Sequence, residues 1–434
     1  MSNLTWAAIQ PLTGGAYFAG EQSFGKQANW ILSYPGLEKE IFGKDGSLRG
    51  IGNERHFLEY LKKKKKLPPY VQFNRGMFDD INGPVAITND NEYSNANFNP
   101  EDTTLKSVDL IVSVPVCSGL SAANTADHGK DDSMKNNNLK FLTKFVLQSV
   151  RPKVYLFENA PALYTPKGKV VRDYLNEIAE VSGYSVTYVK TDTYLHDNIQ
   201  YRPRTYVIFW KWLKDDIPPP VIGFESKKVG TITEYLSRIP TNATQNTKEF
   251  ECYTLDGNQE YAFISKKFGK NWRDTVGRYR LKSFIILNGL ADEFYKFHKD
   301  EKLKAHYDYC LGKKAIGMGY YDRSFFSVAN EKMPTVYHGN TWSALHPIED
   351  RCFTFREYMH FMGLPHDLNY LHNFHSFGSV VGQNVPVRTT KFWIDECRKV
   401  LEDWDNKRII HPEGNKSNIY FHNNVRPEQS KYSD

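Results

Sequence analysis

The chain has 434 residues, 40% hydrophobic and 24% charged, enough for two domains with buried cores. No run of about 18 apolar residues occurs, which excludes a transmembrane helix, and the first residues lack the basic and then apolar layout of a secretory signal. Five widely spaced cysteines exclude a disulfide scaffold and give no metal-ligand pattern, and a net charge of +6 allows a polyanionic partner, so we expect a cytoplasmic protein without membrane association or metal.

Strand and helix patterns alternate through the first half of the chain. Helices are predicted at 139–150 and 170–178, the second stopped by Gly183. Strands are predicted at 108–114, 154–157, 184–190 and 205–210. Such β-α-β units predict an α/β fold with a doubly wound, mixed but mostly parallel sheet, and ligand sites at the carboxyl ends of its strands.

A proline run at 218–220 interrupts this alternation, and we place a domain boundary near residue 213. Residues 1–212 then form the α/β domain and 213–380 a smaller second domain. The segment 381–406 contains an amphipathic helix that we expect to return to the first domain. The polar stretch 407–434 is expected to be a poorly ordered tail, and we expect a monomer.

Candidate reactive side chains lie at the ends of three predicted strands. Cys117 comes directly after a buried strand, Glu158 ends the next strand, and Arg202 and Arg204 precede the last one. A cysteine near a helix start and partly exposed has a lowered pKa and is a candidate nucleophile, whereas Cys117 taken alone is better explained as a buried structural residue. Together, a thiol, a carboxylate and two guanidiniums at one sheet edge predict a site for a polar heteroaromatic ring.

These segments resemble the DNA (cytosine-5)-methyltransferase family. The family shows Pro-Cys-Gln-x-x-Ser, Glu-Asn-Val and Gln-x-Arg-x-Arg in this order. The counterparts here are Val116-Cys117-Ser118-Gly119-Leu120-Ser121, Glu158-Asn159-Ala160 and Gln200-Tyr201-Arg202-Pro203-Arg204. The segments Arg351–Pro365 and Gly382-Gln383-Asn384-Val385-Pro386 are similar to two C-terminal signatures. The resemblance implies a Rossmann-like methyltransferase fold with a target-recognition domain.

The resemblance also implies a reaction, the transfer of a methyl group to C5 of a cytosine flipped out of double-stranded DNA. Cys117 would add to C6 of the ring, and Glu158 would hydrogen-bond N3 and the exocyclic amine. Arg204 would hold O2, and Arg202 would meet a phosphate or the active-site loop. The other matched residues expected at the substrate are Ser121, Asn159, which would brace the cysteine loop, and Gln200, with 122–137 as a closing loop.

S-adenosylmethionine is the cofactor that the resemblance implies, and here the chain departs from the family. The turn Leu12-Thr13-Gly14-Gly15 stands where the family has Phe-x-Gly-x-Gly-Gly, no acidic ribose contact is evident near 32–36, and Gln383 replaces an asparagine. The expected cofactor contacts are Leu12, Thr13, Gly14, Gly15, Asp80, Pro115, Gln383, Asn384 and Val385. Three alternatives stay open: ordinary S-adenosylmethionine, which we favour; a modified sulfonium cofactor that delivers another group; and an inactive DNA-binding homologue.

The second domain is expected to contact DNA through the segment 263–282, in which cations alternate with aromatic residues. The predicted contacts are Lys266, Lys267, Lys270 and Arg273. A surface element whose aromatic residues form a local core explains this window equally well. A tRNA substrate is an alternative, because tRNA-directed relatives share the catalytic motifs. We expect a role in restriction–modification or phage defence, in a bacterial or phage-infected cell.

Overall fold

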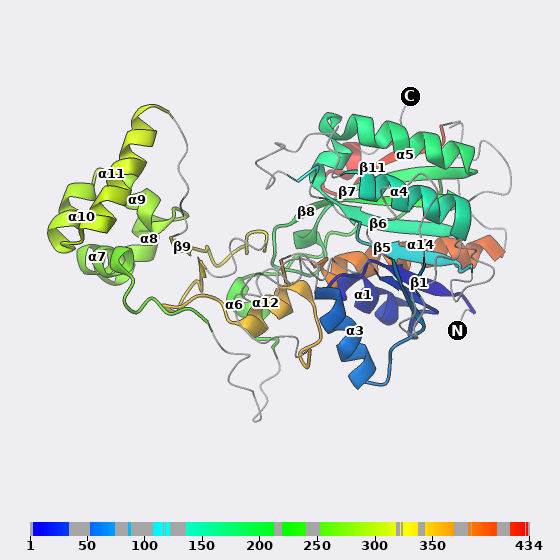
Figure 1. The fold of residues 1–434 in the computed structure, drawn as a ribbon, viewed down its shortest axis with the longest axis horizontal. Coiled ribbons are helices and arrows are strands. Elements are labelled where there is room, and N and C mark those ends of the chain that lie inside the picture. Colours follow the sequence, from blue (N-terminus) through cyan, green and yellow to red (C-terminus); the bar gives the residue numbers. More distant parts are fainter. Residues whose placement is uncertain are drawn as a thin grey trace. The chain divides into compact units, whose positions relative to one another are not determined.

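The chain folds into two compact units (Figure 1). Unit 1 comprises Met1–Val229, Phe361–His372 and Gln383–Asp434, and unit 2 comprises Gly230–His360 and Asn373–Gly382. The computed structural model describes residues 3–33, 53–73, 86–87, 107–115, 117, 119–121, 136–211, 219–239, 252–317, 322, 324–336, 343–368, 381–382, 384–405, 417–429 and 431–432.

Unit 1 is built on one mixed sheet with the strand order β12-β11-β7-β8-β6-β5-β1-β2-β3-β4. The strands are β1 (Trp6–Ile9), β2 (Ile31–Ser33), β3 (Tyr70–Phe73), β4 (Ala86–Ile87), β5 (Leu110–Ser113), β6 (Val154–Asn159), β7 (Tyr184–Asp192), β8 (Pro203–Lys211), β11 (Ile419–Asn423) and β12 (Lys431–Tyr432). Strand β8 runs antiparallel to β6 and β7, β4 and β12 are antiparallel to their neighbours, and the other pairs are parallel. The predicted α/β fold with a mixed, mostly parallel sheet is confirmed.

Helices cover both faces of this sheet. One face carries α4 and α5, and the other carries α1, α3 and α14 (Figure 1). Their bounds are α1 (Gly15–Phe24), α3 (Asn53–Lys63), α4 (Asn137–Phe145), α5 (Lys169–Val181) and α14 (Val387–Asp405). Helix α4 continues into a π-helical turn, Val146–Val150, and short 3-10 turns lie at Pro161–Tyr164, Pro166–Gly168, Thr193–Leu195 and Pro427–Gln429.

Burial explains why the central strands read as continuous apolar runs. Every residue of β5 and of β6 is buried, as expected for strands with helices on both faces. Leu142 and Val146 from one helical segment and Leu175 and Ile178 from α5 belong to the same core cluster. Gly183 ends α5 with a φ of 76°, a conformation that glycine adopts without steric cost.

Helix α14 packs against α1, although some 370 residues separate them. Asp395 accepts a hydrogen bond from the Ser23 hydroxyl at 2.6 Å. The Arg398 guanidinium donates to the Ser23 carbonyl and lies 5.2 Å above the Phe24 ring. The helix predicted within 381–406 therefore belongs to the α/β unit.

The C-terminal segment corrects the expectation of a poorly ordered tail. Strand β11 pairs in parallel with β7 from Ile419 to Asn423, and its Phe421 ring stacks on Tyr188 at 5.2 Å. Polar composition concealed this strand. Strand β7 is an edge of the first-half sheet, and its unpaired backbone groups can hold an added strand whatever the polarity of its side chains.

Unit 2 contains a bundle of short helices with a core of its own. The helices in the described part of the unit are α6 (Ile232–Leu236), α7 (Gln259–Phe268), α8 (Trp272–Val276), α9 (Leu281–Leu287), α10 (Ala291–Phe297), α11 (Glu301–Ala315) and α12 (Phe355–Met362), with a 3-10 turn at Gly269–Asn271. The last two residues of α12 belong to unit 1. Phe263, Trp272 and Phe294 are buried in the bundle core, to which α11 contributes Tyr307. Strands β9 (Phe326–Ser327) and β10 (Ala344–Leu345) form a separate parallel pair.

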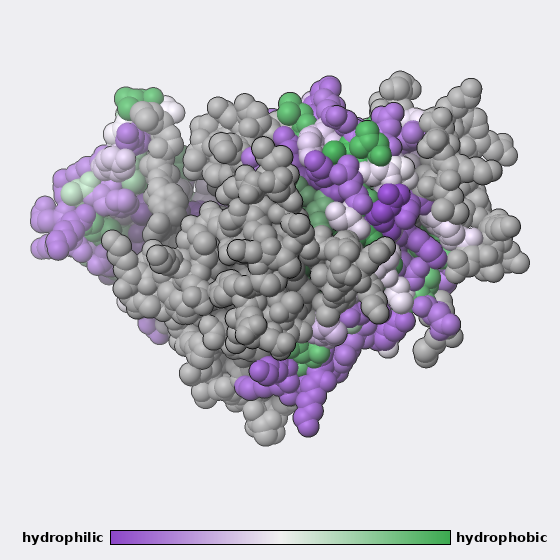
Figure 2. Space-filling model, turned by 45° about the vertical axis from the view of Figure 1, so that its right-hand side comes forward, coloured by the Kyte–Doolittle hydropathy of each residue, from purple (hydrophilic) through white to green (hydrophobic). Residues whose placement is uncertain are grey.

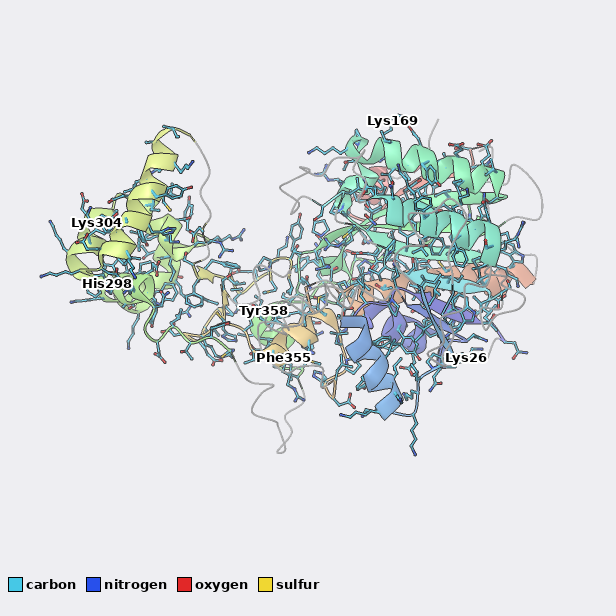
Figure 3. The ribbon with its side chains drawn as sticks, in the orientation of Figure 1. Lys26, Lys169, His298, Lys304, Phe355 and Tyr358 are labelled. Atoms are coloured by element: carbon cyan, nitrogen blue, oxygen red, sulfur yellow. The ribbon has the colours of Figure 1, made fainter. Side chains whose placement is uncertain are left out.

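Helix α12 begins with a capping box, Thr354-Phe355-Arg356-Glu357, within the matched signature. Thr354 Oγ1 accepts a hydrogen bond from the Glu357 backbone N–H, and Glu357 accepts two from Arg351 at 2.9 Å. Phe355 and Tyr358, labelled in Figure 3, are buried. This matched signature therefore organises the start of a helix.

Candidate active site

The topology brings the reactive residues to one edge of the unit 1 sheet. Strands β5 and β6 are parallel, so Cys117 follows the end of the first and Glu158 lies at the end of the second. Strand β8 is antiparallel to β6 and pairs Tyr206 with Glu158, which places its beginning, with Arg204, at the same edge. The three segments are therefore neighbours because of strand direction, as expected from the sequence.

Glu158 and Arg204 form a buried ion pair. The Glu158 Oε1 atom lies 2.5 Å from Arg204 Nε, and the Glu158 side chain is only 5% exposed. Burial raises the pKa of the Glu158 carboxyl, while the positive charges of Arg204 and Arg202 oppose that rise. A carboxyl with a raised pKa, held in place by a guanidinium, is suited to sharing a proton with a ring nitrogen.

Cys117 is partly buried beside this pair. Burial raises the pKa of its thiol and the negative charge of Glu158 raises it further, whereas Arg204 and Arg202 lower it. The expectation of a lowered thiol pKa is therefore wrong for the protein without ligands. The physical reason is that removal of water and a nearby carboxylate outweigh the two guanidiniums.

Arg202 is buried and not at the surface. It is 3% exposed, its Nη2 donates to the Asn384 carbonyl at 2.9 Å, and its backbone N–H donates to Asp192 Oδ1 at 3.0 Å. The expectation that it meets a phosphate is not supported by this burial. Its charge instead acts on Cys117 and Glu158 from within the protein.

The remaining substrate-side residues lie nearby with other partners. Asn159 Oδ1 accepts a hydrogen bond from the Ala160 N–H at 2.9 Å. This bond is local and does not brace the cysteine loop as expected. The Gln200 side chain lies 3.5 Å from the Phe361 carbonyl and 3.3 Å from Met362 Sδ. Ser121 is half-buried shortly after Cys117, and residues 122–135 of the predicted closing loop lie outside the described residues.

The expected cofactor turn joins β1 to α1 at the point where the strand order reverses between β1 and β5. Leu12 has a φ of 50°, in the left-handed region that costs a side-chain-bearing residue about 1 kcal/mol. A Cβ on Gly14 would lie 2.5 Å from the Phe57 ring, and one on Gly15 would lie 2.2 Å from the Val385 carbonyl. The two glycines are thus required by contacts within the protein.

Some of the other expected cofactor contacts lie at or near the β1–α1 turn, and two fall outside the described residues. Thr13 is buried in the same turn, and Pro115 is buried just beyond β5. Asn384 and Val385 lie against Gly15. Asp80 and Gln383 fall outside the described residues.

Two buried polar atoms at this turn have no hydrogen-bond partner among the described residues: Gln10 Oε1, an acceptor, and Asn384 Nδ2, a donor. An unpaired buried polar atom costs about 1–3 kcal/mol. A ligand such as S-adenosylmethionine carries both donors and acceptors, so its chemistry is compatible with these two atoms. Sequence reasoning missed Gln10 and also Asp192, although an acidic residue at the end of a strand was a signal for the latter.

Most of the cationic side chains predicted to contact DNA form ion pairs or cation–ring contacts within unit 2. Arg273 pairs with Asp350 at 2.6 Å and lies 4.5 Å above the Trp272 ring. Lys267 pairs with Glu293 at 2.6 Å, and Lys266 lies 4.8 Å above the Phe297 ring. Lys270 is exposed, without an ion pair to any described residue.

The surface of the bundle is mostly hydrophilic (Figure 2). Many of its charges are paired locally: Lys304, labelled in Figure 3, lies 3.0 Å from Asp308. In the part of the chain that is described, no three His, Cys, Asp or Glu residues are grouped to hold a metal ion. None of the described helices is both long and apolar enough to span a bilayer.

The sheet with its reversed strand order is Rossmann-like, and Cys117, Glu158 and Arg204 lie at its carboxyl edge. A sequence model described as C-5 cytosine-specific DNA methylase matches residues 50–399, most of the chain, and the chain belongs to that family. No curated protein matches the sequence significantly.

Solved structures match this chain at low sequence identity. The Entamoeba histolytica methyltransferase EhMeth, which shows the same fold, is 10% identical, with a TM-score of 0.53, and the match covers 92% of this chain and 99% of that one. A putative DNA modification methyltransferase encoded within a prophage of E. coli is 15% identical, with a TM-score of 0.47 and coverage of 92% and 100%. The S. pombe Dnmt2 methyltransferase is 12% identical, with a TM-score of 0.48 and coverage of 92% and 99%.

Proposed function

We propose that this protein methylates C5 of cytosine in double-stranded DNA, with S-adenosylmethionine as the cofactor and Cys117 as the nucleophile. The observation that carries the proposal is the buried Glu158–Arg204 pair beside the Cys117 thiol, at the carboxyl edge of a methyltransferase sheet. Family membership supports the reaction class. The DNA substrate, the cofactor and the covalent adduct are proposed from the chemistry of these residues.

Cytosine C5 needs activation, because the aromatic ring withholds its electrons. Addition of Cys117 Sγ to C6 forms a C–S bond and leaves the displaced electron pair delocalised between C5 and N3, where Glu158 shares a proton. Arg204 holds Glu158 in place and can also donate to O2 of the ring. C5 thereby becomes a nucleophile.

When bound, S-adenosylmethionine supplies an electrophilic methyl carbon. The residues suited to hold it are those of the β1–α1 turn with the unpaired Gln10 Oε1 and Asn384 Nδ2. After C5 has formed its new bond, the C5 proton passes to a water molecule, the electrons of the C5–H bond form the C5–C6 double bond, and Sγ leaves C6 as the Cys117 thiolate. The target base must leave the stacked duplex for both faces of the ring to be reached.

Burial and the charge of Glu158 raise the pKa of the Cys117 thiol, so it holds its proton more tightly than a free thiol does. When the base binds, the Glu158 carboxyl faces a ring nitrogen, which weakens its effect on the Cys117 thiol and favours loss of the thiol proton to water. We propose that this dependence confines nucleophile activation to the substrate complex.

Nucleoside mass spectrometry of DNA from cells that express the wild type or Cys117→Ala tests the proposal. We expect 5-methyldeoxycytidine with the wild type alone, and Cys252→Ala, which alters a cysteine of unit 2, should retain it. A C5 substituent of another mass would support a modified cofactor. Modified cytidine in tRNA with unmodified DNA, or no product with either nucleic acid, would contradict the proposal.

A further inference from the structure

Asn384 contacts both halves of the proposed site, although it lies some 370 residues from one and 180 from the other. Its side-chain Oδ1 accepts a hydrogen bond from the Gly15 N–H at 2.8 Å, at the first residue of α1. Its backbone carbonyl accepts from Arg202 Nη2 at 2.9 Å. Asn384 is fully buried, so water does not compete for these bonds.

The fit around Asn384 is tight on the side of the turn. A Cβ on Gly15 would lie 2.5 Å from Asn384 Oδ1 and 2.2 Å from the Val385 carbonyl. No side chain larger than hydrogen fits there without displacing residues 384–385. The helix α1 start and the segment that precedes α14 are therefore fixed relative to each other.

One atom of Asn384 is still available. Its Nδ2 is buried and makes no hydrogen bond to any described residue. A ligand that supplied an acceptor to Nδ2 would remove the cost of this unpaired donor and hold the side chain in its present rotamer. The same rotamer is the one that binds Gly15, and the adjoining carbonyl is the one that binds Arg202.

We propose that Asn384 is a positioning residue that couples the cofactor turn to the Cys117–Glu158–Arg204 cluster, through Gly15 on one side and Arg202 on the other. The class of ligand is one with a hydrogen-bond acceptor for Nδ2, here S-adenosylmethionine or its demethylated product, S-adenosylhomocysteine. This identity rests on the proposed function. Occupation of the turn then steadies the guanidinium that favours the Cys117 thiolate.

Alkylation of Cys117 by iodoacetamide, followed by peptide mass spectrometry over a range of pH, tests the coupling. Without ligand, Asn384→Ala and Gly15→Ala should both move the midpoint of the alkylation profile upward by about half a pH unit or more. Each variant breaks or displaces the contact between Gly15 and residue 384, so the backbone carbonyl that accepts from Arg202 is no longer held in place. S-adenosylhomocysteine should lower the midpoint in the wild type and leave it unmoved in both variants. The midpoint is compared because a ligand that only shields the thiol slows alkylation without moving it.

Gly25→Ala is the matched control, since it alters the other end of α1 at a φ of 64°, where an added Cβ meets nothing within 4 Å. It should lower the melting temperature without moving the midpoint. Wild-type midpoints in Asn384→Ala and Gly15→Ala would overturn the coupling, as would an unchanged response to the ligand. Failure of the wild type to bind S-adenosylhomocysteine by calorimetry would overturn the proposed cofactor instead, and the ligand-free midpoints would still decide the role of Asn384.

Discussion

At the scale of single residues, the chemistry depends on how much each charge of the edge cluster is shielded from water. Glu158 is buried and 2.5 Å from Arg204, and its carboxylate raises the pKa of the Cys117 thiol. The same residue is therefore proposed to assist transfer and to restrain the nucleophile. These two roles have opposite consequences for a variant.

Glu158→Gln separates them. We expect single-turnover transfer to DNA to fall by about 10²–10⁴-fold, because Gln cannot share a proton with the ring. We also expect the Cys117 thiol to be alkylated at lower pH than in the wild type, because a repelling negative charge has been removed. Glu180→Gln, an exposed change on α5, should alter neither measurement. A thiol that becomes less reactive in Glu158→Gln would contradict this assignment.

At the scale of elements, strand β11 and helix α14 are packed parts of unit 1 and are joined by contacts between aromatic side chains. Phe421 stacks on Tyr188 and meets Tyr164 edge-on at 5.5 Å. His422 stacks on Phe224 at 4.2 Å and meets Trp393 of α14 at 5.7 Å. The strand therefore ties β7 to the C-terminal helix through its side chains as well as its backbone.

Phe421→Ala should lower the free energy of unfolding by about 2 kcal/mol, below the range for a fully buried phenylalanine because the ring is half-buried. Urea denaturation followed by circular dichroism measures this loss. Val425→Ala, at a residue 42% exposed just beyond the strand, is the control and should change stability by less than about 0.5 kcal/mol. Equal effects of the two variants would show that β11 contributes little.

The buried His422 makes the same region sensitive to acid. Burial lowers the pKa of His422 to about 4, below the value of about 6.5 expected in the unfolded chain. The unfolded state therefore binds a proton first, and stability is lost as the pH falls from about 6.5 towards 4.

Between pH 7.5 and 5, this one histidine should remove about 2 kcal/mol of stability. The His422→Phe variant should lose that much less than the wild type when urea denaturation is compared at the two pH values. Gln429→Ala, an exchange in the following turn that removes no titrating group, should keep the wild-type dependence. An identical pH dependence in His422→Phe would exclude His422 as the source.

At the scale of the whole molecule, the two units have separate cores, and we propose a different function for each. Unit 1 carries the reactive cluster, and unit 2 has its own aromatic core in a bundle of helices. We propose that unit 2 recognises the DNA target. Of the four predicted cations, Lys270 is the one most available for a phosphate. Lys267 and Arg273 form ion pairs within the unit, and the Lys266 ammonium lies 4.8 Å above the Phe297 ring.

Lys270→Gln should reduce the slope of log K against log salt for duplex DNA by about 0.9, the value for one lost phosphate contact. Fluorescence anisotropy with a labelled duplex at several salt concentrations measures the slope. Lys267→Gln is the matched control and should leave it nearly unchanged, because Glu293 already neutralises that lysine. A slope unaltered by Lys270→Gln would remove this residue from the interface.

Much of the α/β unit was predictable from local pattern. Apolar runs and helical spacing predicted the strands now seen as β5, β6, β7 and β8 and the helices α4, α5 and α14. The aromatic residues of 263–282 were ambiguous in the sequence. Phe263 and Trp272 are buried in the bundle, which supports the interpretation of a local core for these two.

Other features depend on contacts that no local pattern encodes. Leu12 in a left-handed conformation and Gly14 against Phe57 follow from packing across the β1–α1 turn. Asn384 reaches Gly15 only because the chain returns to unit 1 after residue 382. Sequence spacing carries no information on such long-range approaches.

The pattern of apolar runs was enough to show which residues stand at strand ends, and parallel strands bring their carboxyl ends to one edge. Cys117 and Glu158 could therefore be placed together from the order of the strands alone, whereas Arg204 reaches the same edge because β8 runs antiparallel to β6. The three-dimensional packing was needed to establish the direction of the Cys117 pKa shift, the burial of Arg202 and the pairing of β11 with β7. Each of these depends on how much water is removed around a group, or on which sheet edge is left free, and both are properties of the packed molecule.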